Sequence, residues 1–201
     1  MALIKHGNNA LSSVTAFPSA VPTGKPVLLS TATASSSSSI EFTSGIDSTY
    51  DIYKFEFINI HAATSGAEYQ FNLSTDNGLN YNVTKTSTAF ESYHLESDAA
   101  YGIVYQASAD HAQGTGDQQL YRNLSTDNDC SYSGYLHLFN PSSNIYVKHY
   151  IARGNGFNTS PTSIDFNIAG YGNTTSAIDA VIFRMSSGNI DAGTIKMYGI
   201  S

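Results

Sequence analysis

The sequence predicts an all-β protein, an antiparallel β-sandwich of the jelly-roll kind that carries an extended N-terminal arm. Short runs rich in Tyr, Phe, Ile and Val alternate apolar and polar side chains with a period of two. Turn residues separate these runs at frequent intervals, and no stretch shows the apolar stripe of an amphipathic helix. The 201 residues, with 14 Tyr and 10 Phe, are enough for one such domain.

Residues 1–39 are predicted to form a docking arm, and residues 40–201 to form the sandwich. Pro18, Pro22 and Pro26 favour an extended backbone and exclude their segment from the middle of a sheet. The segment is too apolar for a free linker, so we expect it to pack on a neighbouring protein; a disordered tail is the alternative. The expected anchors are Leu3, Ile4, Leu11, Val14, Phe17 and Val21.

The first strands are expected at Val27–Thr33 and Ile40–Phe42, separated by a polar interruption at Ser35–Ser39. Tyr50–Ile60 is the longest β-rich run. It is apolar on both faces, which predicts a central strand covered on both sides for part of its length. Its Ile52, Ile58 and Ile60 are expected to share one face with Lys54 and Glu56, which are expected to form a solvated or paired patch on the outer face.

Ala67–Thr86 is predicted to be a β-hairpin. Apolar residues alternate from Tyr69 to Leu73 and again from Leu79 to Val83. Between them, Asn77-Gly78 offers the positive φ that a tight hairpin turn needs. The same letters, Leu-Ser-Thr-Asp-Asn, recur from Leu124, which we interpret as shared turn chemistry.

Further strands are separated by polar loops, of which the longest are Ala107–Asp117 and Arg153–Pro161. In Ile145–Ile151 the branched apolar residues Ile145, Val147 and Ile151 are expected on one face, opposite Lys148 and Tyr150. The expected strands are Ala89–Leu95, Tyr101–Gln106, Gln118–Leu124, Tyr132–Phe139, Ile145–Ile151, Ile164–Tyr171, Ala177–Met185 and Thr194–Ile200.

The composition argues against several partners. The formal charge is −7 and the nine Lys and Arg residues do not cluster, so we expect no binding to nucleic acid. No apolar run reaches membrane-spanning length and the N-terminus has no secretory pattern, so we expect no membrane association and synthesis in a cytoplasm. Cys130 is the one cysteine, which we interpret as a small buried residue.

No catalytic motif is found, so the sequence predicts a protein that is not an enzyme, with no catalytic residue, no metal and no cofactor. His137 and His149 lie in adjacent predicted strands, where cross-strand packing is favoured over metal binding. Asp127 and Asp129 lack the pattern of a calcium loop.

Exposed tyrosines offer a different role, because an aromatic face can stack on a sugar ring. The candidates are Tyr101, Tyr105, Tyr132 and Tyr171; packing in the core or across strands is the alternative.

Several segments resemble a family of bacteriophage virion proteins that is frequent in marine and cyanobacterial phages. These segments are Ile46–Tyr50, Tyr53–His61, Leu79–Thr86, Leu136–His149, Ala169–Gly193 and Thr194–Ser201. The resemblance implies a structural component of the virion, such as a capsid decoration (cement) protein, with a tail-fibre or tail-tip module that binds a receptor or glycan as the alternative. It also implies other capsid or tail proteins as partners and a homo-oligomer, for which a trimer is expected by analogy.

Overall fold

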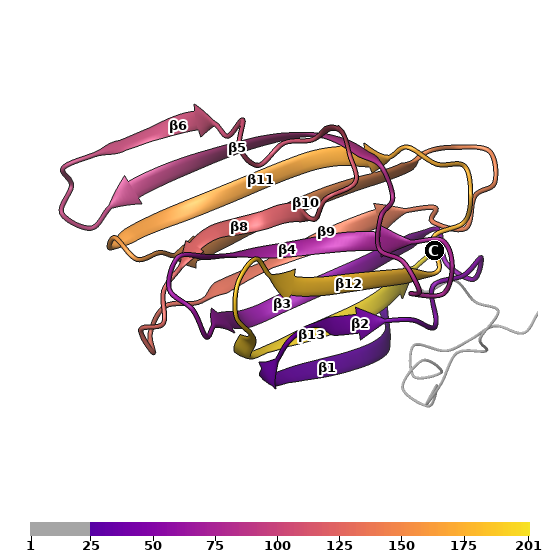
Figure 1. Cartoon of the computed structure of the whole chain (residues 1–201), viewed down its shortest axis with the longest axis horizontal. Helices are drawn as coiled ribbons and strands as arrows, with labels where there is room; N and C mark the ends of the chain where they lie inside the picture. The colour runs from indigo at the N-terminus through magenta and orange to yellow at the C-terminus, as the bar shows by residue number, and fades with distance from the viewer. Residues whose placement is uncertain (1–24) are drawn as a thin grey trace, which may run out of the picture.

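The computed structural model describes residues 25–201, and all of their regular structure is β (Figure 1). Two antiparallel sheets pack face to face, so the prediction of an antiparallel β-sandwich is confirmed. The expected arm anchors, from Leu3 to Val21, lie outside the described residues.

The larger sheet contains nine strands. They are β1 (Val27–Ser37), β3 (Ile52–Ala62), β5 (Lys85–Leu95), β6 (Tyr101–Tyr105), β7 (Ala112–Gly114), β9 (Tyr132–Phe139), β10 (Lys148–Phe157), β11 (Thr162–Gly172) and β13 (Ile190–Ile200). Their order is β1-β13-β3-β9-β10-β11-β5-β6, and β7 also pairs with β5. One side of this sheet faces the core, and the other is the outer face.

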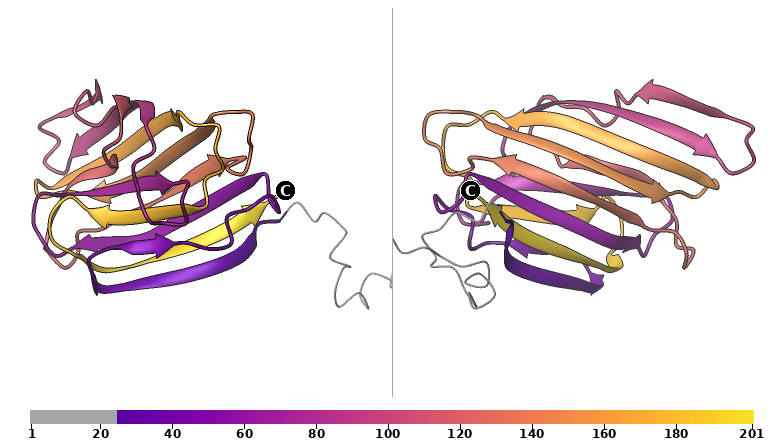
Figure 2. Two further views of the ribbon diagram at one scale, coloured as in Figure 1. Left: turned by 45° about the vertical axis from the view of Figure 1, so that its right-hand side comes forward. Right: turned by 180° about the vertical axis from the view of Figure 1, so that it is seen from behind.

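The smaller sheet has four strands in the order β2-β12-β4-β8. They are β2 (Ile40–Phe42), β4 (Ala67–Ser74), β8 (Gln118–Leu124) and β12 (Ala180–Met185). It covers the part of the larger sheet that includes β3 and β9, while the β5–β6 end extends beyond it (Figures 1 and 2).

The core between the sheets is aromatic. Phe183 of β12 packs against Phe55 and Phe57 of β3 and against Tyr69 and Phe71 of β4, with ring centroids 5.2–6.4 Å apart. All five side chains are fully buried. These rings join the two sheets, and truncation of one of them would cost about 3–5 kcal/mol.

The predicted boundary at residue 39 is wrong, because β1 belongs to the sandwich. It pairs with β13 from Val27↔Gly199 to Ser37↔Ile190. As an edge strand it needs backbone partners on one side only, and Ala34 is its one fully buried side chain. A sequence rich in Ser and Thr therefore serves as a strand, including Ser35–Ser37, where an interruption was expected.

The predicted hairpin is also wrong in its pairing. β4 lies in the smaller sheet and β5 in the larger one, and residues 75–84 connect the two sheets. The turn chemistry itself is present, since Asn77 and Gly78 have φ values of 59° and 81°. Leu79, expected on a strand, is 82% exposed. Alternation of apolar and polar side chains indicates an extended backbone, but it does not indicate which other strand that backbone pairs with.

The shared turn chemistry of the two Leu-Ser-Thr-Asp-Asn segments is confirmed. The Ser74 hydroxyl donates to the Asp76 carboxylate at 2.8 Å and accepts from the Asp76 amide at 3.1 Å. Ser125 and Asp127 repeat both hydrogen bonds at 3.0 and 3.1 Å. Each segment thus ends its strand with the same side-chain turn.

A bulge changes the faces of β3. Asn59 has a φ of 50° and the register shifts between Phe57 and Ile60. Ile60 is therefore buried in the core while Ile58 stays exposed on the outer face, so the expectations of a shared face and of cover on both sides are wrong. Lys54 and Glu56 pair at 2.6 Å on the outer face, as expected.

Strand β10 differs from its prediction both in which of its side chains face the core and in its length. Lys148 and Tyr150 are buried, whereas Ile145 and Ile151 are exposed. The strand also continues through Gly154 and Gly156, which were expected in a loop. A Cβ at either glycine would lie 2.5 Å from a tyrosine ring of the core, so the missing side chains make room for those rings.

Candidate binding site on the larger sheet

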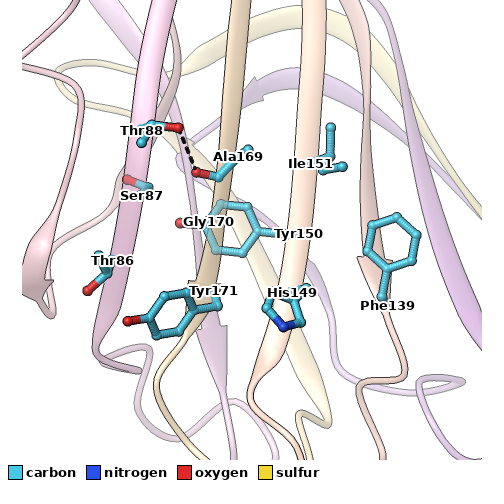
Figure 3. Close-up of a pocket in the computed structure, with 10 residues that line it drawn as sticks. All are labelled: Thr86, Ser87, Thr88, Phe139, His149, Tyr150, Ile151, Ala169, Gly170 and Tyr171. Atoms are coloured by element: carbon cyan, nitrogen blue, oxygen red, sulfur yellow. Dashed lines mark hydrogen bonds between the residues drawn. The ribbon is translucent and has the colours of Figure 1, made fainter.

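The outer face of the larger sheet carries a hollow of about 460 Å³, within the usual range of small-molecule sites (Figure 3). We call it the aromatic hollow. It lies over neighbouring ends of β5, β11, β10 and β9. Its lining residues are Thr86, Ser87, Thr88, Phe139, His149, Tyr150, Ile151, Ala169, Gly170 and Tyr171.

Strand register places three rings side by side in the aromatic hollow. Tyr171 of β11 is paired with His149 of β10, with ring centroids 6.0 Å apart. Phe139 of β9 is next to His149, because Leu138 is paired with Tyr150. Figure 3 shows the three rings in a row, one from each strand. The row is therefore held by backbone pairing rather than by a loop.

Beneath the row, the core supports the hollow. A Cβ at position 170 would lie 2.6 Å from the Tyr150 hydroxyl. Because Gly170 has no side chain, the Tyr150 ring fits under β11. That hydroxyl donates to Gln118 at 2.9 Å, and burial raises the pKa of Tyr150. The floor is thus fixed by a buried hydrogen bond.

The chemistry of the aromatic hollow is that of a binding surface. No carboxylate is among its lining residues, so the paired acid and base of a hydrolase are missing from it. Its polar groups on the outer face are the hydroxyls of Thr86, Thr88 and Tyr171 and the His149 imidazole. The Thr88 hydroxyl donates to the Ala169 carbonyl at 3.4 Å. Aromatic faces with nearby hydroxyls suit a ligand with an apolar ring face.

The four tyrosines proposed to stack on a ligand do not come together. Tyr171 lines the aromatic hollow, while Tyr101 and Tyr105 are exposed on β6 at the edge of the sheet. Tyr132 is fully buried and stacks on Tyr121 with centroids 4.9 Å apart, so its assignment as a stacking residue is wrong. Tyr132 lies on the face of β9 that points to the core, where Gly134 and Gly154 leave space for its ring.

A second, polar pocket of about 390 Å³ contains Cys130, His61 and Asp191 but is not arranged for nucleophilic catalysis. Both ring nitrogens of His61 are engaged, one 3.1 Å from the Asp127 carbonyl and the other 3.3 Å from the Asp191 carboxylate. Burial raises the pKa of the Cys130 thiol, which keeps it protonated. The interpretation of Cys130 as a buried residue is confirmed.

Within residues 25–201, no group of three or more His, Cys, Asp or Glu side chains is placed to hold a metal ion. His137 and His149 share the outer face without being direct partners. His137 of β9 is paired with Ile151 of β10. His149 lies two residues before Ile151 on β10, beside Phe139 of β9.

Comparison with known proteins gives no match: no family model, curated protein or solved structure is similar to this chain. In the described part of the chain, no helix has the length and apolarity needed to cross a bilayer.

Two buried lysines have structural partners. Lys148 donates to the carbonyls of Ser143, Tyr146 and Thr175 at 2.5, 2.7 and 3.4 Å, and burial lowers its pKa. Lys85 donates to Asn72 at 2.6 Å and to the Val83 carbonyl at 2.8 Å. Burial lowers the pKa of Lys85 to about 8 despite the opposing charge of Asp117.

Asp117, directly before β8, joins the start of that strand to β4 and β12 of the smaller sheet. It accepts two hydrogen bonds from Arg184 of β12, at 2.5 and 2.9 Å, and one from Asn72 of β4 at 2.9 Å. Because Lys85 of β5 donates to Asn72, this group of side chains also links the larger sheet to β4 and β12 of the smaller sheet.

Proposed function

We propose that this chain is a non-enzymatic structural protein of a bacteriophage particle. In this proposal it is a capsid decoration (cement) protein whose sandwich is anchored by its N-terminal arm. The observation that supports this most directly is that residues 25–201 form two packed sheets whose core extends from Ala34 to Met197. The sequence of residues 1–24, with Pro18, Pro22 and the apolar anchors, predicts an arm that contacts other proteins.

We further propose that the sandwich is a jelly roll with two insertions. Eight strands divide into β1-β13-β3-β9 and β2-β12-β4-β8. The sequence neighbours β1 and β2, β3 and β4, β8 and β9, and β12 and β13 then lie in opposite sheets, as two Greek keys require. The remaining strands, β5–β7 and β10–β11, widen the larger sheet. Viral capsid proteins and lectins use this architecture, which supports the proposal by analogy of fold.

The proposed partners are other virion proteins, capsid or tail, and further copies of this chain. A trimer is proposed by analogy, with the protein synthesised in the host cytoplasm and then incorporated into the virion. The net charge of −7 supports protein partners over nucleic acid.

Deletion of residues 1–24 tests the anchoring role. The truncated protein should keep its circular dichroism spectrum and melting transition but should fail to join particles that lack the native protein. A matched full-length variant, Leu79→Ala, changes an 82% exposed side chain on the sandwich and should join particles normally. Normal incorporation of the truncated protein would show that the arm is not the anchor.

A receptor- or glycan-binding module at a tail tip is the second candidate, and the aromatic hollow is the observation that favours it. Titration with simple sugars, followed by NMR, should then shift resonances of Tyr171 and His149. Tyr171→Ala should abolish those shifts, and Tyr146→Ala, at an exposed site outside the hollow, should leave them unchanged. No shift with any sugar tested would favour the decoration role.

A further inference from the structure

We propose that strand β6 pairs with β6 of a second copy across a two-fold axis, joining the two larger sheets into one. β6 is the last strand of the larger sheet and lies at its upper boundary in Figure 1. Its one neighbour is β5; among the described residues, no strand pairs with its other edge. The views in Figure 2 show the same edge projecting beyond the smaller sheet.

The side chains of β6 are unusually apolar for a free edge. Tyr101, Ile103 and Tyr105 are 73%, 78% and 54% exposed, and Phe90 of β5 is exposed beside them. Val104, on the opposite face, is also exposed. Edge strands are normally protected by charged residues, proline or a bulge. β6 has neither charge nor proline, and its five residues pair with β5 without a register shift.

The nearby charges flank β6 instead of covering it. At one end His94 contacts Asp98 at 3.0 Å, and at the other end the Tyr105 hydroxyl donates to Asp110 at 2.5 Å. A strand laid along β6 would therefore meet the apolar side chains without burying an unpaired charge.

A second copy is the occupant that fits best, because β6 reads nearly the same in both directions. Its sequence is Tyr-Gly-Ile-Val-Tyr. Antiparallel pairing centred on Ile103 places this residue opposite itself and Tyr101 opposite the partner's Tyr105. A two-fold contact requires this kind of self-complementarity, and aromatic pairs across strands stabilise it.

The available area agrees with a reversible dimer. The apolar side chains of β6 and Phe90 expose on the order of 500 Å² in each copy, so a pair could bury at most about 1,000 Å² of them, near the lower limit of specific interfaces. Backbone hydrogen bonds of the added strand contribute further. The β1 edge of another copy is a poorer occupant, because its exposed residues are mostly Ser and Thr.

The first test measures the mass of the full-length protein over a range of concentrations by analytical ultracentrifugation. A two-fold contact should appear as association that Ile103→Lys weakens at least tenfold, because two ammonium groups then meet at the axis. Leu79→Lys adds the same charge at another exposed apolar site and should leave association unchanged. A protein that is monomeric at all concentrations, or a trimer unaffected by Ile103→Lys, would overturn the inference.

The second test uses disulfide formation to determine which residues of the two β6 strands face each other. Facing residues in an antiparallel pair have Cα atoms about 4.5–5.5 Å apart, within the range of a disulfide. Ile103→Cys should therefore form a covalent dimer under mild oxidation, whereas Tyr101→Cys should do so only when mixed with Tyr105→Cys. The wild type, whose Cys130 is buried, is the control. Self-linking of Tyr101→Cys without that of Ile103→Cys would contradict the proposed axis, as would no linking in either variant.

Discussion

Replacement of Lys148 by methionine is predicted to destabilise the protein, although it removes a buried charge. The Lys148 ammonium donates to the Ser143 and Tyr146 carbonyls at 2.5 and 2.7 Å, and the Thr175 carbonyl lies at 3.4 Å. Methionine has a similar length and no donor, so the variant isolates the loss of these hydrogen bonds.

The expected loss is about 2–4 kcal/mol. Each of the two short hydrogen bonds has a charged donor, and a hydrogen bond to a charged group contributes about 1.5–3 kcal/mol. Relief of the ammonium desolvation, which lowers the pKa of Lys148, offsets part of that cost. For a protein of this size the result corresponds to a melting temperature lower by roughly 4–16 °C.

Urea denaturation measures this loss directly, and hydrogen exchange locates it. Exchange should accelerate in residues 143–147 and 173–176, the loops that the ammonium joins. Lys54→Met is the matched control, because Lys54 forms a half-buried surface pair with Glu56 and the loss of this pair should cost less than about 1 kcal/mol. Equal stability of the two variants would refute the assigned role of Lys148.

Three further predictions concern the core. The folded state binds the Lys85 proton more weakly than the unfolded state, so the free energy of unfolding should rise between pH 8 and pH 10; the rise should be smaller in Lys85→Met, where only Lys148 keeps a lowered lysine pKa, as measured by urea denaturation at each pH. Gly154→Ala should cost about 1–3 kcal/mol, because its Cβ would lie 2.5 Å from the Tyr132 ring, while Gly116→Ala, which meets only a side-chain atom at 3.6 Å, should cost little; equal melting temperatures would contradict this. The Tyr132 hydroxyl is buried with no hydrogen-bond partner among the described residues, so Tyr132→Phe should be neutral or stabilising in thermal denaturation, whereas Tyr150→Phe should lose about 1 kcal/mol with its hydrogen bond to Gln118.

The sequence predicts most strands of this fold, but not which strands pair. Side-chain alternation and turn residues locate β4, β8, β9 and β11 closely, because both depend on local backbone geometry. Pairing depends on hydrogen bonds between residues far apart in the chain. β4 therefore reads as half of a hairpin, although its partners are β12 and β8.

The prediction of a loop in the glycine-containing part of β10 is wrong for a related reason. Gly154 and Gly156 indicate a loop in the sequence, yet the structure uses them to seat the rings of Tyr132 and Tyr121, which come from other strands. A residue type that signals a turn locally can thus signal close packing when a distant side chain occupies the space.

The aromatic hollow could be predicted only in part. The sequence indicates Tyr171 as a candidate exposed ring, but it does not indicate His149 or Phe139, and it wrongly indicates Tyr132, which is buried. Alternation shows that every second side chain of a strand shares a face, but it does not show which of the two sets faces the core. A lysine ordinarily lies on the outer face, so Lys148 favours the wrong assignment for β10.

Lys148 sets the phase of β10 against that expectation. Because three carbonyls surround its ammonium, the lysine can face the core, and Tyr150 and Ala152 follow it inward. His149 and Ile151 must then face outward, where they meet Tyr171 and Phe139 in the aromatic hollow. A one-residue shift of β10 would exchange these faces and remove the hollow. The same three hydrogen bonds that stabilise the loops therefore also determine which side chains the outer face presents to a partner or ligand.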